Sequence, residues 1–150
     1  MKGSTHMLAG ISSALVYSHL MAEPSWQIIL GGILGSLLPD IDHPKSTVAL
    51  KLKLHLFIRH RGFTHSLTAL LLFILIAPWA EAVLHHDLYR GIIIGIISHI
   101  FLDTLTPAGV QLFFPCKKRF SLPLLAIIHK LLKTVLGFIL LIYVIYYLCK

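Results

Sequence analysis

The sequence has few charged residues and still fewer acidic ones. Lys, Arg, Asp and Glu make up 13% of its 150 residues, whereas hydrophobic residues make up 57%. The mean hydropathy is +0.84. A soluble domain of this length lacks the interior needed to bury so much apolar surface. The composition therefore excludes an ordinary soluble protein and predicts an integral membrane protein that forms a single domain over residues 1–150.

Cysteine is also scarce, and no nucleic-acid motif is present. Cys116 and Cys149 lie far apart and form no CxxC pair, so neither a disulfide framework nor a thiolate metal site is predicted. The 13 basic residues outnumber the six acidic ones, which in a soluble protein would suggest nucleic acid. Here they lie in loops between apolar runs, where they set topology and attract anionic lipid. We expect a membrane, and no nucleic acid, as partner, and the oligomeric state stays open.

Five apolar segments cover about residues 7–22, 26–38, 63–84, 88–105 and 120–149. They predict an all-α, polytopic membrane bundle with four to five transmembrane helices. Thr64 is expected to cap the third helix and Pro78 to kink it, and Lys130 and Lys133 to divide the last segment. The loops 42–63 and 106–119 hold eight Lys and Arg residues, whereas the turns 23–25 and 85–87 hold none. The positive-inside rule therefore places these loops and the N-terminus on the cytoplasmic side of the inner membrane.

Four polar clusters lie at the cytoplasmic ends of these segments. They are Thr5-His6, Asp40-Ile41-Asp42-His43, His60-Arg61-Gly62-Phe63-Thr64-His65-Ser66 and Ser98-His99-Ile100-Phe101-Leu102-Asp103. Ionisable residues near a bilayer are costly unless they have a function, and imidazole and carboxylate groups are ligands of hydrolytic metal ions. Antiparallel helices bring all four clusters to the same end. The sequence therefore predicts a metal site at the cytoplasmic surface of the membrane.

Three of the clusters also have a purely structural explanation. His99 and Asp103 lie four residues apart on one helix face, as two metal ligands would, or as a histidine bonded to its helical neighbour. Asp40 and Asp42 are ligands or turn residues, and which of them binds a metal is left open. Arg61 either holds a phosphate or carboxylate or is a topology charge. The convergence of the clusters favours the metal interpretation.

The four motifs occur in order between about residues 5 and 115, and together they resemble the YdjM-type family. Its members are LexA-regulated, membrane-bound, metal-dependent hydrolases of bacteria and archaea. The resemblance implies four or five transmembrane helices and metal-dependent hydrolysis. The motifs are also distantly similar to those of zinc-dependent phospholipase C, whose further histidine and glutamate ligands have no match here.

We therefore predict a metal-dependent hydrolase with one or two divalent ions, zinc first and manganese or magnesium as alternatives. The predicted ligands are His6, Asp40, Asp42, His65, His99 and Asp103, and the predicted catalytic residues are Asp42, His60 and Arg61. The predicted substrate is a membrane lipid or lipid-linked phosphoester, cleaved by metal-activated water. The alternatives are a metal-ion or proton-coupled transporter that uses the same cluster, and a structural protein with a folding metal.

Overall fold

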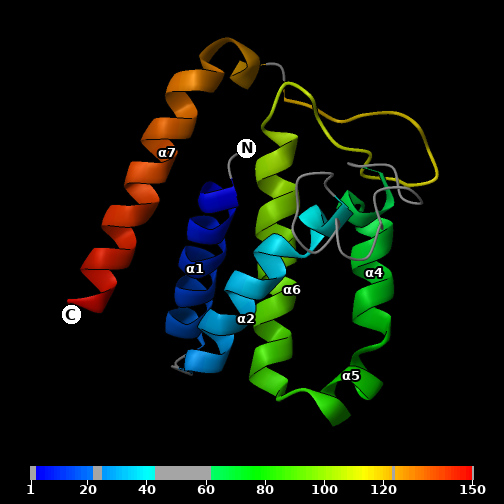
Figure 1. The fold of residues 1–150 in the computed structure, drawn as a ribbon, viewed down its shortest axis with the longest axis vertical. Helices are drawn as coiled ribbons and strands as arrows, with labels where there is room; N and C mark the ends of the chain where they lie inside the picture. Colours follow the sequence, from blue (N-terminus) through cyan, green and yellow to red (C-terminus); the bar gives the residue numbers. More distant parts are fainter. Residues whose placement is uncertain (1–2, 22–24, 43–61, 123, 150) are drawn as a thin grey trace.

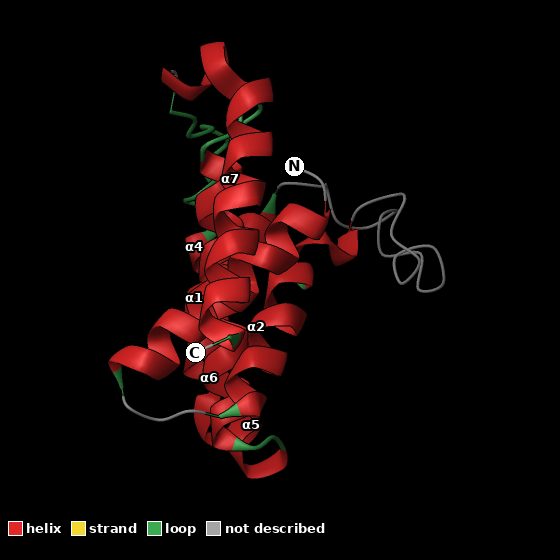
Figure 2. Ribbon diagram, turned by 90° about the vertical axis from the view of Figure 1, so that its left-hand side faces the viewer, coloured by secondary structure: helices red, strands yellow, loops and turns green. Residues whose placement is uncertain are grey.

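Helices make up the regular structure of this protein. The computed structural model describes residues 3–21, 25–42, 62–122 and 124–149. In chain order the helices and 3₁₀ turns are α1 (Gly3–Leu20), α2 (Trp26–Leu37), η1 (Pro39–Asp42), η3 (Phe63–His65), α4 (Leu67–Leu75), α5 (Ala77–Val83), α6 (His86–Thr104) and α7 (Leu124–Leu148). Within these ranges the only β pairing is an isolated bridge between Val110 and Phe120, and Figure 2 shows no strand. The all-α prediction is confirmed.

Helices α1, α2 and α6 lie side by side and form the centre of the molecule (Figure 1). Glycines set their spacing, because the backbones approach where a side chain would collide. A Cβ added to Gly35 of α2 would lie 2.0 Å from the carbonyl oxygen of Ile92 in α6. On the other side of α2, a Cβ at Gly10 of α1 would lie 2.3 Å from the carbonyl oxygen of Gly32. The three helices are therefore held at fixed positions along one another.

The third apolar segment forms two helices rather than one. Helix α4 ends at Leu75 and is followed by Ile76, and Pro78 occupies the first turn of α5, where its missing N–H costs no hydrogen bond. This confirms the expected kink. The ring of Phe73 in α4 stacks on Tyr89 of α6 at a centroid distance of 5.1 Å, and the Tyr89 hydroxyl donates to the Phe73 carbonyl. These contacts hold α4 against the central helices.

The last segment forms one helix, and its division at Lys130 and Lys133 into a surface piece and a membrane helix stays a prediction. Helix α7 runs without interruption from Leu124 to Leu148, past the two lysines that were expected to divide it. Lysine is a good helix former, so it marks a change of polarity without breaking the backbone hydrogen bonds. None of the helices in the described part of the chain is both long and apolar enough to cross a membrane. The predicted number of membrane spans stays a prediction.

The loop at residues 105–122 connects α6 to α7, and Figure 1 shows it crossing to the start of α4 on the way. The Leu67 N–H donates to the Leu112 carbonyl at 2.9 Å, and the Thr68 hydroxyl donates to the Phe114 carbonyl at 2.8 Å. At its other end the loop returns to α6, where the Leu122 N–H donates to the carbonyl of Thr104 in the last turn. The loop thereby fixes the turn η3, which directly precedes α4.

Candidate metal centre

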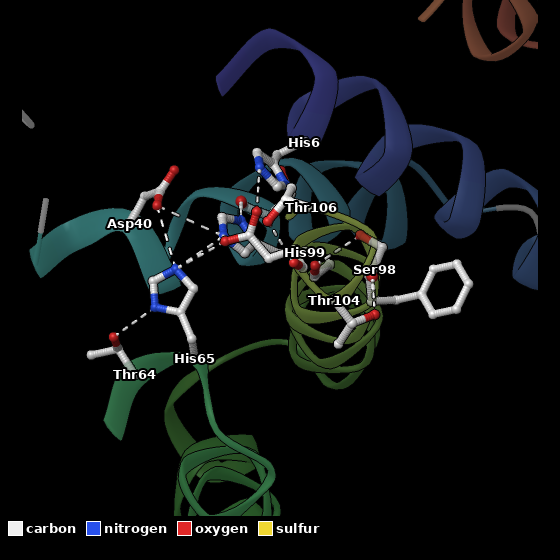
Figure 3. Close-up of polar contacts among 12 residues, drawn as sticks. His6, Asp40, Thr64, His65, Ser98, His99, Thr104 and Thr106 are labelled. Carbon is white, nitrogen blue, oxygen red and sulfur yellow. Dashed lines mark hydrogen bonds and ion pairs between the residues drawn. The ribbon is translucent and has the colours of Figure 1, made fainter. Parts of the chain in front are cut away.

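Five of the six predicted ligands meet at one end of the bundle (Figure 3). His6 comes from the first turns of α1 and Asp40 from η1, directly after α2. His65 lies in η3, and His99 and Asp103 lie on the last two turns of α6. Because α1 begins where α2 and α6 end, the chain directions bring these side chains together. The structure thus shows the predicted convergence for these five residues.

The distances among the donor atoms suit a shared cation. The Nε2 atoms of His65 and His99 are 3.3 Å apart. Asp40 Oδ1 lies 3.5 Å from the first and 3.7 Å from the second, and Asp103 Oδ2 lies 3.7 Å and 3.9 Å from them. The carboxylate distances are too long for good hydrogen bonds. Ligands bound about 2.0–2.2 Å from a tetrahedral ion lie roughly 3.3–3.6 Å from one another, so the residues fit a metal.

His6 completes the cluster from the opposite side of His99. The two rings stack at a centroid distance of 3.8 Å and an angle of 16°, and His6 Nε2 lies 3.5 Å from Asp103 Oδ1. Two groups of donors could hold an ion: His6, Asp40 and His99, and His65, His99 and Asp103. His99 belongs to both groups. They therefore describe overlapping positions in one site rather than two separate sites.

Hydrogen bonds on the far side of the rings fix which nitrogen can bind a metal. His99 Nδ1 lies 2.6 Å from the carbonyl oxygen of Ser36. A carbonyl only accepts, so Nδ1 carries the proton and Nε2 of the neutral ring presents a lone pair. His65 Nδ1 lies 3.0 Å from the Thr64 hydroxyl, which can accept in the same way. Metal-binding histidines are usually oriented by such partners.

The cluster is buried, with one edge more open than the rest. The side chains of His65 and His99 are 0% exposed and that of Asp103 is 2% exposed, whereas Asp40 is 30% exposed. Burial lowers the pKa of His6 to about 3, so the ring is neutral, the form that binds metal, at neutral pH. Burial alone would raise the pKa of Asp40, but His65 and His99 outweigh it and hold that pKa below its usual range. A neutral His6 ring and an ionised Asp40 carboxylate therefore belong to the same cluster.

The structure settles only part of the remaining predictions. His60 and Arg61 lie outside the described residues, as does the side chain of Asp42, so the three predicted catalytic residues stay predictions. The structure places the Asp40 carboxylate in the cluster, and it does not describe the position of the Asp42 carboxylate. The Thr64 cap is wrong: Ser66 caps α4, its Oγ accepting from the Ala69 N–H at 3.1 Å. The 3₁₀ turn η3 occupies Phe63–His65, so α4 begins only at Leu67.

Sequence reasoning missed Ser36, and it placed Thr106 in a turn near the cluster without finding its contact with Asp103. Ser36 accepts the hydrogen bond of His99 with its main-chain carbonyl. Every residue has such a carbonyl, so the side-chain sequence gives no sign of this contact. The Thr106 hydroxyl donates to the Asp103 carbonyl at 2.8 Å, at the point where α6 ends. A threonine three residues after a predicted ligand at a helix end is the signal that could have suggested this second contact.

Comparison with known proteins agrees with the motifs. The family model described as YdjM inner membrane protein matches residues 1–150. Inner membrane protein YdjM of Escherichia coli (strain K12) is 40% identical over 141 residues, covering 83% of this chain and 71% of the relative. Uncharacterized protein YvsG of Bacillus subtilis (strain 168) is 32% identical over 129 residues, covering 83% and 79%. No solved structure matches the chain. On the family match and these identities, the chain belongs to the YdjM inner membrane protein family.

Proposed function

We propose that this chain is a metal-dependent hydrolase of the inner membrane. The observation that carries the proposal is the pair of Nε2 atoms of His65 and His99, 3.3 Å apart and flanked by the carboxylates of Asp40 and Asp103. The Ser36 carbonyl directs the His99 lone pair to this point. Lone pairs and negative charges gathered in a buried space favour a cation among them.

A divalent ion, zinc in this proposal, would be held by three or four of the five donors His6, Asp40, His65, His99 and Asp103, which leaves a position open for water. The two carboxylates would balance its charge while the imidazoles stay neutral. The presence of His99 in both donor groups favours one ion. When bound, the ion supplies an acidified water, with a pKa lowered from ~15.7 to ~7, and polarises the bond to be cleaved.

The protein residues supply orientation, water exclusion and proton transfer. Asp40 is the most exposed of the five donors, so an entering substrate would meet the cluster at this side chain. Its ionised carboxylate can accept a proton during hydrolysis. Asp42, His60 and Arg61 belong to the neighbouring chain segments, and in this proposal Arg61 holds a phosphate oxygen of the substrate.

The proposed substrate is a phosphoester of a membrane lipid or a lipid-linked molecule. The name of the Escherichia coli relative, an inner membrane protein, supports the location, and the apolar composition agrees with it. The proposal includes four to five membrane-spanning helices and a site that faces the cytoplasm together with the N-terminus. The basic loops 42–63 and 106–119 support this orientation.

The cluster lies where hydrolysis at a membrane surface is more plausible than transport. Transporters usually bind their ions near the bilayer midplane, on interrupted helices. Here the donors lie at the start of α1, after the end of α2 and on the last turns of α6. An ion held at helix ends is accessible from one face of the membrane, as an enzyme requires.

Metal analysis tests the proposal directly. Purified wild-type protein is expected to hold about one zinc per chain, and His99→Ala and Asp103→Ala are each expected to lose it. His19→Ala is the matched control, because His19 is exposed near the opposite end of α1. Unchanged metal content in both cluster variants would contradict the site.

A second assay separates hydrolysis from transport. The metal-loaded protein is screened against lipid phosphoesters and, in parallel, for ion flux in liposomes. Turnover that disappears in His99→Ala supports the hydrolase. Metal retention without turnover, combined with ion flux, would favour the transporter instead.

A further inference from the structure

An apolar cavity of about 200 Å³ adjoins the metal cluster. Its wall includes Pro39 and Ile41 of η1, Thr64 of η3, and Ala69, Leu70 and Phe73 of α4. Two of these turns also carry metal-site donors: Asp40 lies between Pro39 and Ile41, and His65 follows Thr64. The same short turns therefore form the wall of the cavity and one side of the cluster.

The most exposed donor of the cluster, Asp40, lies between two residues that line this cavity. Asp40 is 30% exposed, whereas the other four donors are almost completely buried. Figure 3 shows Asp40, His65 and Thr64 together on one side of the cluster. A molecule bound at Asp40 would therefore be close to the turn residues that line the cavity.

We propose that the cavity receives the apolar chain of a membrane amphiphile whose anionic group lies against the metal cluster. This rests on the proposed function and specifies its substrate as a molecule with an anionic ester and an alkyl or acyl chain. Ala69, Leu70 and Phe73 would then determine which chain lengths are accepted.

The lining explains this preference. Of the described residues that line the cavity, none is charged, and the Thr64 hydroxyl already contacts His65 Nδ1. A polar group placed there would lose its hydrogen bonds to water without replacement. The volume exceeds the roughly 150 Å³ of an apolar cavity that holds a benzene ring, so several methylene groups have room. Each buried methylene is expected to raise affinity roughly fourfold.

The test measures how affinity depends on chain length. Zinc-loaded full-length protein in amphipol is titrated with inorganic phosphate and with ethyl-, butyl-, hexyl- and octylphosphonate, which hydrolysis does not consume. For the wild type, affinity is expected to rise roughly fourfold for each added methylene until the cavity is full. Inorganic phosphate, which has no chain, reports on the metal cluster alone.

Two variants of α4 make the test specific. Ala69→Phe fills the cavity and is expected to remove the dependence on chain length while inorganic phosphate affinity and zinc content stay unchanged. Leu71→Phe is the matched control, because it places the same ring on an exposed position of α4 that does not line the cavity. Its chain-length dependence is expected to equal that of the wild type.

The outcomes separate this inference from the proposed function. Zinc retention with equal affinities for all phosphonates in the wild type would overturn the chain-binding cavity and leave the metal site standing. Equal chain-length dependence in the wild type and in a zinc-loaded Ala69→Phe variant would also overturn it. Absence of zinc from the wild type would overturn the proposed function itself. If Ala69→Phe fails to fold, Ala69→Leu replaces it and is expected to weaken octylphosphonate more than ethylphosphonate.

Discussion

Replacing Gly35 by alanine tests whether helix spacing sets the metal cluster. The new Cβ would lie 2.0 Å from the carbonyl oxygen of Ile92, and this separation must open to about 3.4 Å, where ordinary contact begins. The Cα atom of Gly35 and the carbonyl oxygen of Ile92 both belong to helix backbone, which cannot bend away as a side chain can. Helices α2 and α6 must therefore move apart. Ser36 is the next residue, and its carbonyl holds His99 Nδ1 at 2.6 Å.

The cost follows from these two contacts. Overpacking costs about 1–3 kcal/mol, and leaving the His99 Nδ1–H without its buried acceptor costs about 1–3 kcal/mol more. The better helix propensity of alanine returns about 0.5–1 kcal/mol. We expect Gly35→Ala to lower the free energy of unfolding by about 2–4 kcal/mol, or the melting temperature by roughly 5–15 °C.

The assay combines thermal melting in detergent with zinc content. Zinc affinity is expected to fall at least tenfold in Gly35→Ala, because donor groups must stay within about 0.5 Å of their binding geometry. Gly137→Ala in α7 is the matched control, since its added Cβ meets no atom within 4 Å. We expect it to leave both measurements unchanged or to raise stability slightly. A Gly35→Ala protein as stable as the control, with wild-type zinc affinity, would refute the reasoning.

Two further predictions concern the cap of α4 and the pH dependence of stability. Ser66→Ala removes the hydroxyl that accepts from the Ala69 N–H, and is expected to cost about 1 kcal/mol in chemical denaturation, with Ser25→Ala, whose side chain makes no cap bond, as its control. An equal loss in both would contradict the cap. Burial lowers the pKa of His6 from 6.5 to about 3, so below pH 6.5 the unfolded chain takes up a proton that the folded chain does not. The metal-free protein is therefore expected to lose stability as the pH falls from 6.5 towards 3, and melting curves of His6→Gln should show a shallower slope; identical slopes would disprove the assignment.

The order of the apolar segments and the charge of the loops were sufficient to predict which ends of the helices meet. His6, Asp40 and His99 lie beside apolar segments whose alternating directions follow from the positions of the loops. The i, i+4 spacing of His99 and Asp103 needed only a continuous helix, which the segment provides. These features depend on local sequence and on segment order, and both can be read without coordinates.

The features that sequence reasoning missed depend on contacts between distant backbones. The Ser36 carbonyl faces His99 across 63 residues, and the Thr68 hydroxyl bonds Phe114 across 46. A carbonyl belongs to every residue, so no pattern marks the one that is used. The cap at Ser66 was missed because the turn η3 delays the start of α4, and such a turn has no strong periodicity of its own.

The loop at residues 105–122 has a consequence for how the site is completed. All five donors lie between His6 and Asp103, yet the bonds that hold the start of α4 come from Leu112 and Phe114. During synthesis all five donors therefore leave the ribosome before Leu112 and Phe114, whose hydrogen bonds hold the start of α4 next to His65.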